Sequence, residues 1–128
     1  MDFSFTEEQE LLAENLVEFM DREYPESLIK ECDEQKIFPV EANKKFYEAG
    51  FGAIGVPEEL GGVPADMVTM CLVTSIVYRY SWAGCTYSPL SIMNAADKAS
   101  PEIRTEMLEG LMSGEKRHSF GNTEPGAG

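Results

Sequence analysis

The chain has 128 residues, which is enough for one domain that buries about two thirds of its unfolded surface. Ten basic and 23 acidic residues give a formal net charge of −13, which argues against nucleic acid and anionic membrane surfaces as partners, because both are polyanions. Three widely spaced cysteines and a single histidine support neither a disulfide framework nor a metal site.

The first segment begins with Met1 and leads directly into acidic residues without a secretory leader pattern, so we expect an unprocessed cytoplasmic protein. Thr6 and Gln9 form a capping-box pattern, which predicts a helix that runs to about Tyr24. Its apolar stripe consists of Leu12, Leu16, Phe19 and Met20.

Two shorter helices are predicted next. The first runs from Pro25 to about Glu34, with Leu28 and Ile29 as its buried contacts. The second runs from Pro39 to Ala49, and Gly50 follows where a helix-ending glycine is favoured. We expect its apolar face to consist of Ala42, Phe46 and Ala49.

The segment 51–62 is dense in glycine and proline and predicts an ordered loop; a phosphate cradle is the minor alternative, because GxGxxG and Lys-Ser/Thr are absent. Asp66 then caps a helix over Met67–Tyr78 that is apolar nearly all round, so we expect it to be buried on several sides. It is too short to span a bilayer, which needs about 20 apolar residues. The following stretch, 81–88, either lines a cavity or forms a packed connection.

Two helices close the series, one from Pro89 to about Ala99 and one from Pro101 to Gly114, with Ser100 as the N-cap of the second. The predicted apolar stripe of the last helix is Ile103, Met107, Leu108 and Leu111. These segments predict an all-α fold, an orthogonal or up-down bundle of five to six helices, followed by a short strand-like segment at the end of the chain.

No self-contained catalytic set is apparent in the sequence, since one histidine without GxSxG cannot define a triad. His118, beside Lys116 and Arg117, is interpreted as part of a solvated basic patch, with a catalytic role as the minor alternative. Cys71 is expected to be an inert buried thiol, whereas Cys85 is the cysteine to test for reactivity.

The end of the chain carries the most specific motif. The run Thr123–Gly128 reads TEPGAG and resembles the flavin-contacting segment of the acyl-CoA dehydrogenase family. The opening Met1–Leu11, the loop Gly50–Gly62 and the spacing from Gly114 to the motif are also similar to that family. The resemblance therefore covers the whole chain as the family's N-terminal helical domain, residues 1–118, with 119–128 as the start of the flavin-contacting segment before a β-barrel domain.

A finer resemblance concerns the branch of the family. Glu31-Cys32-Asp33 and the stretch Gly62–Thr69 are similar to the branch that includes crotonobetainyl-CoA reductases.

The resemblance implies FAD as cofactor, with contacts at Phe120, Asn122, Thr123 and Gly128. A strand can lay an aromatic side chain on the flat face of a flavin and offer a hydroxyl to its polar edge, tasks that suit Phe120 and Thr123; packing is the alternative role of both. Asn122 departs from the small apolar residue that the family more often has there.

The family also implies an acyl-CoA substrate, a wall of its acyl pocket around Tyr80–Leu90, an electron-transfer flavoprotein as partner, and a place in fatty acid metabolism. The family's catalytic carboxylate resembles nothing in this chain. We therefore expect a truncated N-terminal domain of a homo-oligomeric enzyme that is colourless and inactive alone, and assign it no catalytic residue.

Two other interpretations remain. The same domain could serve as a non-catalytic helical interaction or dimerisation module, with a large apolar surface. Alternatively, an unrelated helical interaction domain carries TEPGAG by chance, which a structure without the buried hub at Met67–Tyr78 would favour.

Overall fold

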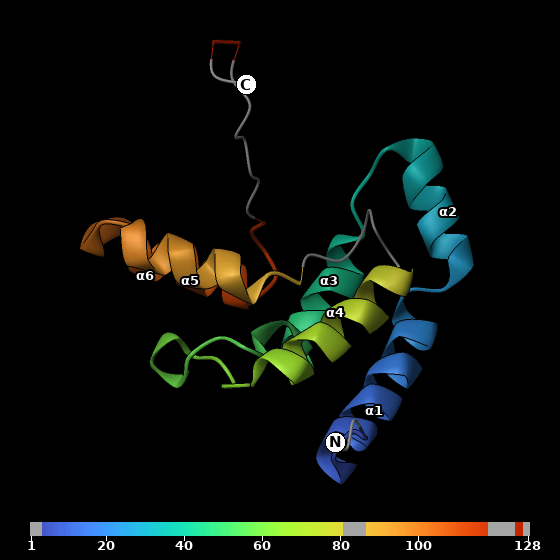
Figure 1. Ribbon diagram of the computed structural model, residues 1–128. Coiled ribbons are helices and arrows are strands. Elements are labelled where there is room, and N and C mark those ends of the chain that lie inside the picture. Colours follow the sequence, from blue (N-terminus) through green and yellow to red (C-terminus); the bar gives the residue numbers. More distant parts are fainter. Residues whose placement is uncertain (1–3, 81–86, 118–124, 127–128) are drawn as a thin grey trace.

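The computed structural model describes residues 4–80, 87–117 and 125–126. Within these residues the fold is all-α, as the sequence predicts, with six α-helices and two short 3-10 turns (Figure 1). The elements are α1 (Glu7–Glu23), α2 (Glu26–Gln35), α3 (Val40–Glu48), η1 (Phe51–Ala53), η2 (Glu58–Leu60), α4 (Met67–Tyr80), α5 (Pro89–Lys98) and α6 (Pro101–Met112).

The described part of the chain contains no named β-strand, only an isolated parallel bridge between Ile54 and Val63 inside the predicted loop. Of the expected strand-like segment 119–128, only Pro125 and Gly126 are described, and they form a turn. The strand and the domain division at residue 118 therefore remain predictions.

The first turns of α1 and α4 are capped and joined to each other. In α1, the Gln9 backbone N–H donates to Thr6 Oγ1 over 3.2 Å and the Thr6 N–H donates to Gln9 Oε1 over 3.1 Å, which confirms the capping box. In α4, Asp66 Oδ1 accepts from the Thr69 N–H at 2.7 Å, as expected of a cap. Gln9 Nε2 also donates to Thr69 Oγ1 over 3.0 Å, so the starts of the two helices are held side by side.

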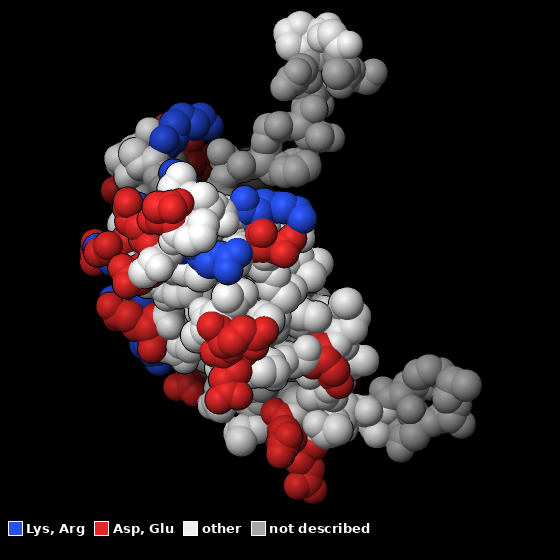
Figure 2. All heavy atoms as spheres, turned by 90° about the vertical axis from the view of Figure 1, so that its left-hand side faces the viewer, with Lys and Arg blue, Asp and Glu red and all other residues white. Residues whose placement is uncertain are grey.

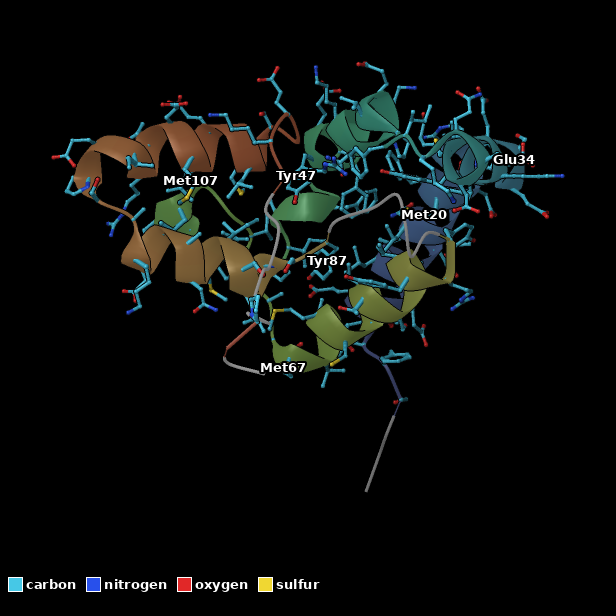
Figure 3. All side chains as sticks on the ribbon, turned by 90° about the horizontal axis from the view of Figure 1, so that it is seen from above. Met20, Glu34, Tyr47, Met67, Tyr87 and Met107 are labelled. Atoms are coloured by element: carbon cyan, nitrogen blue, oxygen red, sulfur yellow. The ribbon has the colours of Figure 1, made fainter. Side chains whose placement is uncertain are left out.

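The main core lies where α1, α3 and α4 meet. Leu16 and Met20 of α1, Phe46 of α3, and Val73 and Val77 of α4 are all completely inaccessible to solvent. Met20, labelled on α1 in Figure 3, belongs to this core. Burial of each such side chain stabilises the fold by about 1.5–3 kcal/mol relative to an exposed position. The core between α1, α3 and α4 therefore contributes a large part of the stability of the domain.

Phenylalanine rings tie the core to the loop after α3. The Phe19 ring lies 5.2 Å from the Phe51 ring and 6.1 Å from the Phe46 ring, centroid to centroid, in tilted arrangements. A second, smaller cluster of buried residues consists of Val56, Ile92 and Leu111. It packs the hairpin of α5 and α6 onto the same loop, so the segment 51–62 is an ordered element, as predicted.

The expectation that α4 is buried on several sides is wrong. Val73, Ile76 and Val77 face the core, whereas Met67, Val68 and Tyr78 have 61, 54 and 49% of their surface exposed. The reason is geometric: α4 packs along α1 with one face, and no other described element covers the opposite face.

Smaller corrections concern the other helices. Ala49 and Ile103, expected on apolar faces, are exposed, because α3 ends before Ala49 and the buried face of α6 is formed later in the helix, by Gly110 and Leu111. In α2 the buried residue is Cys32, while Leu28 and Ile29 are only partly buried.

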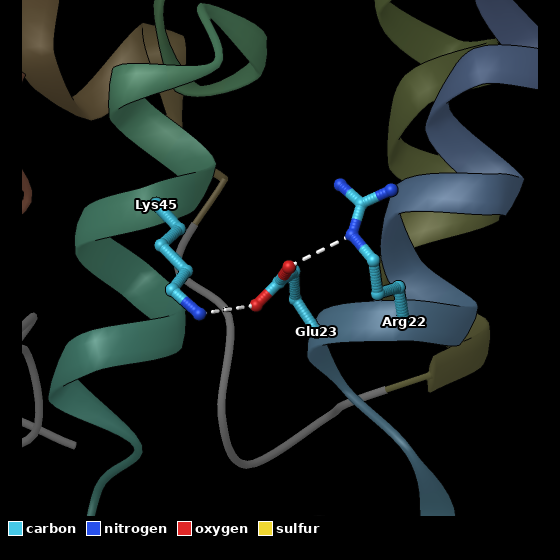
Figure 4. A network of polar contacts seen from close by, with 3 residues as sticks. All are labelled: Arg22, Glu23 and Lys45. Atoms are coloured by element: carbon cyan, nitrogen blue, oxygen red, sulfur yellow. Dashed lines mark hydrogen bonds and ion pairs between the residues drawn. The ribbon is translucent and has the colours of Figure 1, made fainter.

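The surface is strongly acidic. Figure 2 shows Asp and Glu spread over one face, with fewer Lys and Arg among them. One acidic side chain bridges two helices: Glu23 Oε2 accepts from Lys45 Nζ of α3 at 2.7 Å, and Glu23 Oε1 from the neighbouring Arg22 Nε at 2.9 Å (Figure 4). These hydrogen bonds, the one from Lys45 first, lower the pKa of the Glu23 carboxyl.

The Glu23 bridge predicts a pH-dependent stability. A lowered folded pKa means that ionised Glu23 stabilises the folded state above its ordinary pKa of 4.5, and that this contribution disappears as the pH falls through the folded value. Glu23→Gln should therefore be less stable than the parent chain at neutral pH, and the difference should shrink in acid. Urea denaturation across that pH range measures it.

Glu18→Gln, at an exposed position of the same helix, is the matched control and should leave stability nearly unchanged at every pH. A Glu23→Gln deficit that stays constant into acid would contradict the assigned role of the carboxylate.

Candidate functional site

A surface cleft opens between α4 and the first turn of α5. Its volume is about 260 Å³, and its wall consists of Met67, Met70, Cys71, Thr74, Tyr87, Ser88, Pro89 and Leu90. Figure 3 shows Met67 on α4 and Tyr87 just before α5. The described lining is mostly apolar, and none of its residues carries a charge at neutral pH, in contrast to the acidic surface of the domain.

The hydroxyl groups of the cleft are bonded within the protein. Thr74 Oγ1 donates to the Met70 carbonyl oxygen over 2.7 Å, which is a local bond within α4. The Ser88 Oγ donates to Ser91 Oγ over 2.7 Å. The described part of the lining therefore offers a ligand mainly carbon and sulfur atoms.

Tyr87 fixes the start of α5 to the loop after α3. Its side chain is buried, and its hydroxyl donates to the Ile54 carbonyl oxygen over 2.9 Å. Burial, with a smaller effect of the neighbouring Cys71, raises the pKa of Tyr87 to about 12, so the phenol stays a neutral donor. Gly55, at φ +84°, lies directly against the Met70 side chain, where a Cβ would collide with it. The loop and α4 thus set the back of the cleft together.

The exit from α6 is held by a buried asparagine. Asn43 of α3 is 1% exposed, and its Nδ2 donates to the Gly114 carbonyl oxygen over 2.9 Å. Gly114 ends α6 as predicted, at φ +72°, and a Cβ there would lie 3.0 Å from the Asn43 carbonyl oxygen. The chain therefore leaves the helical domain at a fixed point on α3, towards the TEPGAG motif.

Sequence reasoning missed Asn43, although a signal was present. It is a polar residue beside Ala42 and Phe46 on the buried face of α3, and a buried amide needs a partner. That need could have predicted a contact with a distant segment.

The basic residues after α6 are exposed, as expected, but they are paired and not merely solvated. Lys116 Nζ lies 2.6 Å from Glu106 Oε1, and the Arg117 guanidinium carbon lies 3.8 Å from the centroid of the Phe38 ring. Both contacts return this segment to the helical domain. His118, the third residue of the expected patch, lies outside the described residues.

The residues expected to contact flavin, Phe120, Asn122, Thr123 and Gly128, lie outside the described part of the chain, as does Cys85. Pro125 and Gly126 of the motif are exposed, and no described atom lies within 4 Å of a Cβ placed at Gly126.

Of the acyl-pocket region expected around Tyr80–Leu90, Tyr80 and Tyr87–Leu90 are described. Tyr87–Leu90 line the cleft, whereas Tyr80 packs against the main core. Cys71, expected to be buried, is exposed in its wall, because this side of α4 is not covered.

Two kinds of site are not found in the described residues. None of the helices there is long and apolar enough to cross a membrane. The same residues contain no group of three or more His, Cys, Asp and Glu side chains arranged to hold a metal ion.

Comparison with known proteins identifies the domain. Residues 6–115 match the family model "Acyl-CoA dehydrogenase, N-terminal domain". The chain belongs to the acyl-CoA dehydrogenase family. An unrelated helical domain with a chance TEPGAG is therefore excluded, and the hub formed by Val73, Ile76 and Val77 is present.

Curated members of the acyl-CoA dehydrogenase family align with all or nearly all of the chain. The "Probable acyl-CoA dehydrogenase YdiO" of Escherichia coli (strain K12) is 32% identical over 130 residues, which cover 100% of this chain and 34% of that protein. The "Acryloyl-CoA reductase (NADH)" of Anaerotignum propionicum is 34% identical over 133 residues, covering 100% and 33%. The "3-(aryl)acrylate reductase" of Clostridium sporogenes (strain ATCC 15579) is 33% identical over 128 residues, covering 97% and 34%.

The chain thus spans about a third of the length of these acyl-CoA dehydrogenase relatives. No solved structure matches it significantly.

Tyr87→Phe tests how the cleft of this family member is held. Removing the hydroxyl leaves the Ile54 carbonyl without this donor, so we expect a loss of about 1–2 kcal/mol in the free energy of unfolding. Tyr78→Phe, at a position that is 49% exposed, is the control and should change stability by less than about 0.5 kcal/mol. Urea denaturation measures the free energy of unfolding of both variants. Equal losses would show that the hydrogen bond from Tyr87 to the Ile54 carbonyl oxygen does not stabilise the fold.

Proposed function

We propose that the chain is the N-terminal helical domain of an FAD-dependent acyl-CoA dehydrogenase or reductase, and that it forms one wall of the flavin and acyl-CoA site. Residues 1–118 make the helical domain, and residues 119–128 begin the flavin-contacting segment that leads to a β-barrel domain. The observation that carries this proposal is the apolar cleft at Tyr87–Leu90, the region that the family resemblance assigns to the acyl pocket.

The cofactor contacts are proposed at Phe120, Asn122, Thr123 and Gly128. Phe120 covers a face of the flavin ring, the Thr123 hydroxyl bonds to its edge, and Gly128 permits close approach. When bound, FAD supplies the two-electron chemistry at the Cα–Cβ bond of the acyl thioester.

The helical domain binds and orients the substrate and supplies no acid or base. The α4–α5 cleft takes the acyl tail and keeps water from it, because its wall is apolar. The catalytic carboxylate belongs to a later domain, so this chain alone should neither turn over nor hold flavin tightly. The proposal also includes an electron-transfer flavoprotein as the electron partner and a homo-oligomeric enzyme. It further includes a cytoplasmic location and a role in fatty acid metabolism.

A chimera tests this function. The chain replaces the matching N-terminal third of the Escherichia coli relative and joins its remaining two thirds at the end of TEPGAG. We expect a yellow protein with about one flavin per chain, whose visible flavin band bleaches on addition of a suitable acyl-CoA. The 128-residue chain alone should be colourless.

Two point variants sharpen the comparison. Thr123→Val should lower the flavin content of the chimera, whereas Thr105→Val, an exposed threonine on α6, should not. A folded chimera without flavin, or a stoichiometrically yellow 128-residue chain, would argue against the proposal.

The alternative is a non-catalytic helical interaction or dimerisation module. The observation that favours it is the exposed apolar face of α4, with Met67, Val68 and Tyr78. A module that pairs with itself through this face should sediment as a dimer at micromolar concentration, and Val68→Asp should make it monomeric. A monomer in sedimentation velocity at that concentration weakens this alternative and leaves the domain assignment untouched.

A further inference from the structure

We propose that Arg117, stacked on Phe38, is a positioning residue that docks the exit segment, residues 114–117, along α3. That the TEPGAG motif beyond this segment contacts flavin rests on the proposed function. The docking itself follows from contacts between described residues. Arg117 thus acts on cofactor binding through the position of the chain, without touching the cofactor.

The exit segment runs back along α3, against the direction of that helix. Asn43 Nδ2 donates to the Gly114 carbonyl oxygen over 2.9 Å. At the other end of the segment, the Arg117 guanidinium carbon lies 3.8 Å from the centroid of the Phe38 ring, just before the start of α3. One contact would fix a point on the helical domain, whereas two contacts in this order also fix the direction in which the chain leaves.

The anchor at Asn43 is the more rigid of the two. Asn43 is 1% exposed and Gly114 is buried. A Cβ at Gly114 would lie 3.0 Å from both the Asn43 carbonyl oxygen and the Tyr47 ring, so the backbone lies directly on α3. Water competes weakly for a buried hydrogen bond, so we expect this anchor to open less often than the exposed end of the segment.

The other contacts of the exit segment are less suited to hold it on α3. Lys44 Nζ of α3 lies 3.7 Å from Glu115 Oε1, an ion pair at the surface that water and salt weaken. Lys116 Nζ pairs with Glu106 Oε1 at 2.6 Å, and the Lys116 N–H donates to a carbonyl oxygen of α6 over 2.8 Å. These two contacts hold the segment to α6, which leaves its alignment on α3 to Arg117.

Phe38 gives the guanidinium a fixed surface. Its ring is partly buried, and its carbonyl oxygen accepts from the Val40 N–H over 2.9 Å. The next residue, Pro39, is buried and restricts the backbone further. A guanidinium on an aromatic face leaves its edge open to water, so the stack forms at little cost in solvation. At an exposed site such a contact raises the population of the docked form about two- to fivefold.

The stack acts on the motif over a short length of chain. Phe120 and Thr123, which we propose as flavin contacts, follow Arg117 by three and six residues. Chains of that length span at most about 11 and 22 Å. Release of Arg117 therefore changes where the motif can lie relative to the helical domain. Because the cofactor binds the docked form, its apparent affinity falls with the docked fraction.

Limited proteolysis of the 128-residue chain tests the docking without flavin. Trypsin must take the Arg117 side chain into its own pocket, so it cuts after this residue only while the stack is open. Phe38→Leu keeps an apolar side chain and removes the aromatic face. It should speed this cleavage about two- to fivefold relative to cleavage after Lys98, an exposed lysine at the end of α5.

Phe38→Tyr keeps the aromatic face and is the matched control, so its cleavage rate after Arg117 should equal that of the parent chain. Mass spectrometry of the fragments measures both rates. Equal cleavage after Arg117 in the parent chain and in Phe38→Leu would overturn the docking.

The chimera with the Escherichia coli relative tests the effect on the cofactor. Phe38→Leu and Arg117→Gln should each raise the dissociation constant of FAD about two- to fivefold, measured by the fluorescence of released flavin. Phe38→Tyr, and Arg104→Gln at an exposed position of α6, should leave it unchanged.

The double variant distinguishes positioning from direct attraction of the cofactor by the charge of Arg117. In the Phe38→Leu background, Arg117→Gln should have no further effect on the dissociation constant, because the stack is already lost. Losses that add up would mean that the charge acts independently of Phe38, which would overturn the positioning role.

The outcome is separable from that of the proposed function. The flavin content of the parent chimera decides the function before any variant is compared. A yellow parent chimera whose FAD affinity does not respond to Phe38→Leu keeps the function and rejects this inference. A colourless parent chimera rejects the function and the effect on flavin, whereas the trypsin rates still decide whether Arg117 docks on Phe38.

Discussion

The contact between α1 and α4 is the constraint on which the rest of the domain depends. Leu16 and Met20 on one helix meet Val73 and Val77 on the other, all without solvent access. Because this contact uses a single face of α4, the other face, with Met67 and Cys71, remains at the surface. The cleft exists because a helix with apolar residues on both sides has a partner on only one of them.

The remaining walls are positioned by bonds to the loop after α3. Tyr87 reaches the Ile54 carbonyl, while Gly55 allows the Met70 side chain to lie directly on the backbone. The parallel bridge between Ile54 and Val63 stiffens the same loop. A segment that the sequence marks only as rich in glycine and proline thus sets the distance between α4 and α5, and with it the width of the cleft.

The sequence predicts where helices begin and end better than it predicts which of their faces are buried. Thr6, Asp66 and Gly114 act as predicted because capping and positive φ are local properties of a few residues. The burial of α4 was mispredicted because composition records that a side chain is apolar, not whether another element reaches it. The cleft joins α4 to residues after 86, a pairing that no local pattern encodes. The small and aromatic residues of 81–88 left a cavity lining open as one of two alternatives, and the family resemblance pointed to the same region.

The hydrogen bond from Asn43 to Gly114 joins residues 71 positions apart. Contacts of such long range form late in folding, because the entropy of closing the intervening chain must first be offset by the packing of the helices between them. The direction in which the chain departs towards TEPGAG is therefore set only once α3 and α6 have met. A nascent chain would therefore complete this bundle before the segment after Gly114 has a fixed starting point.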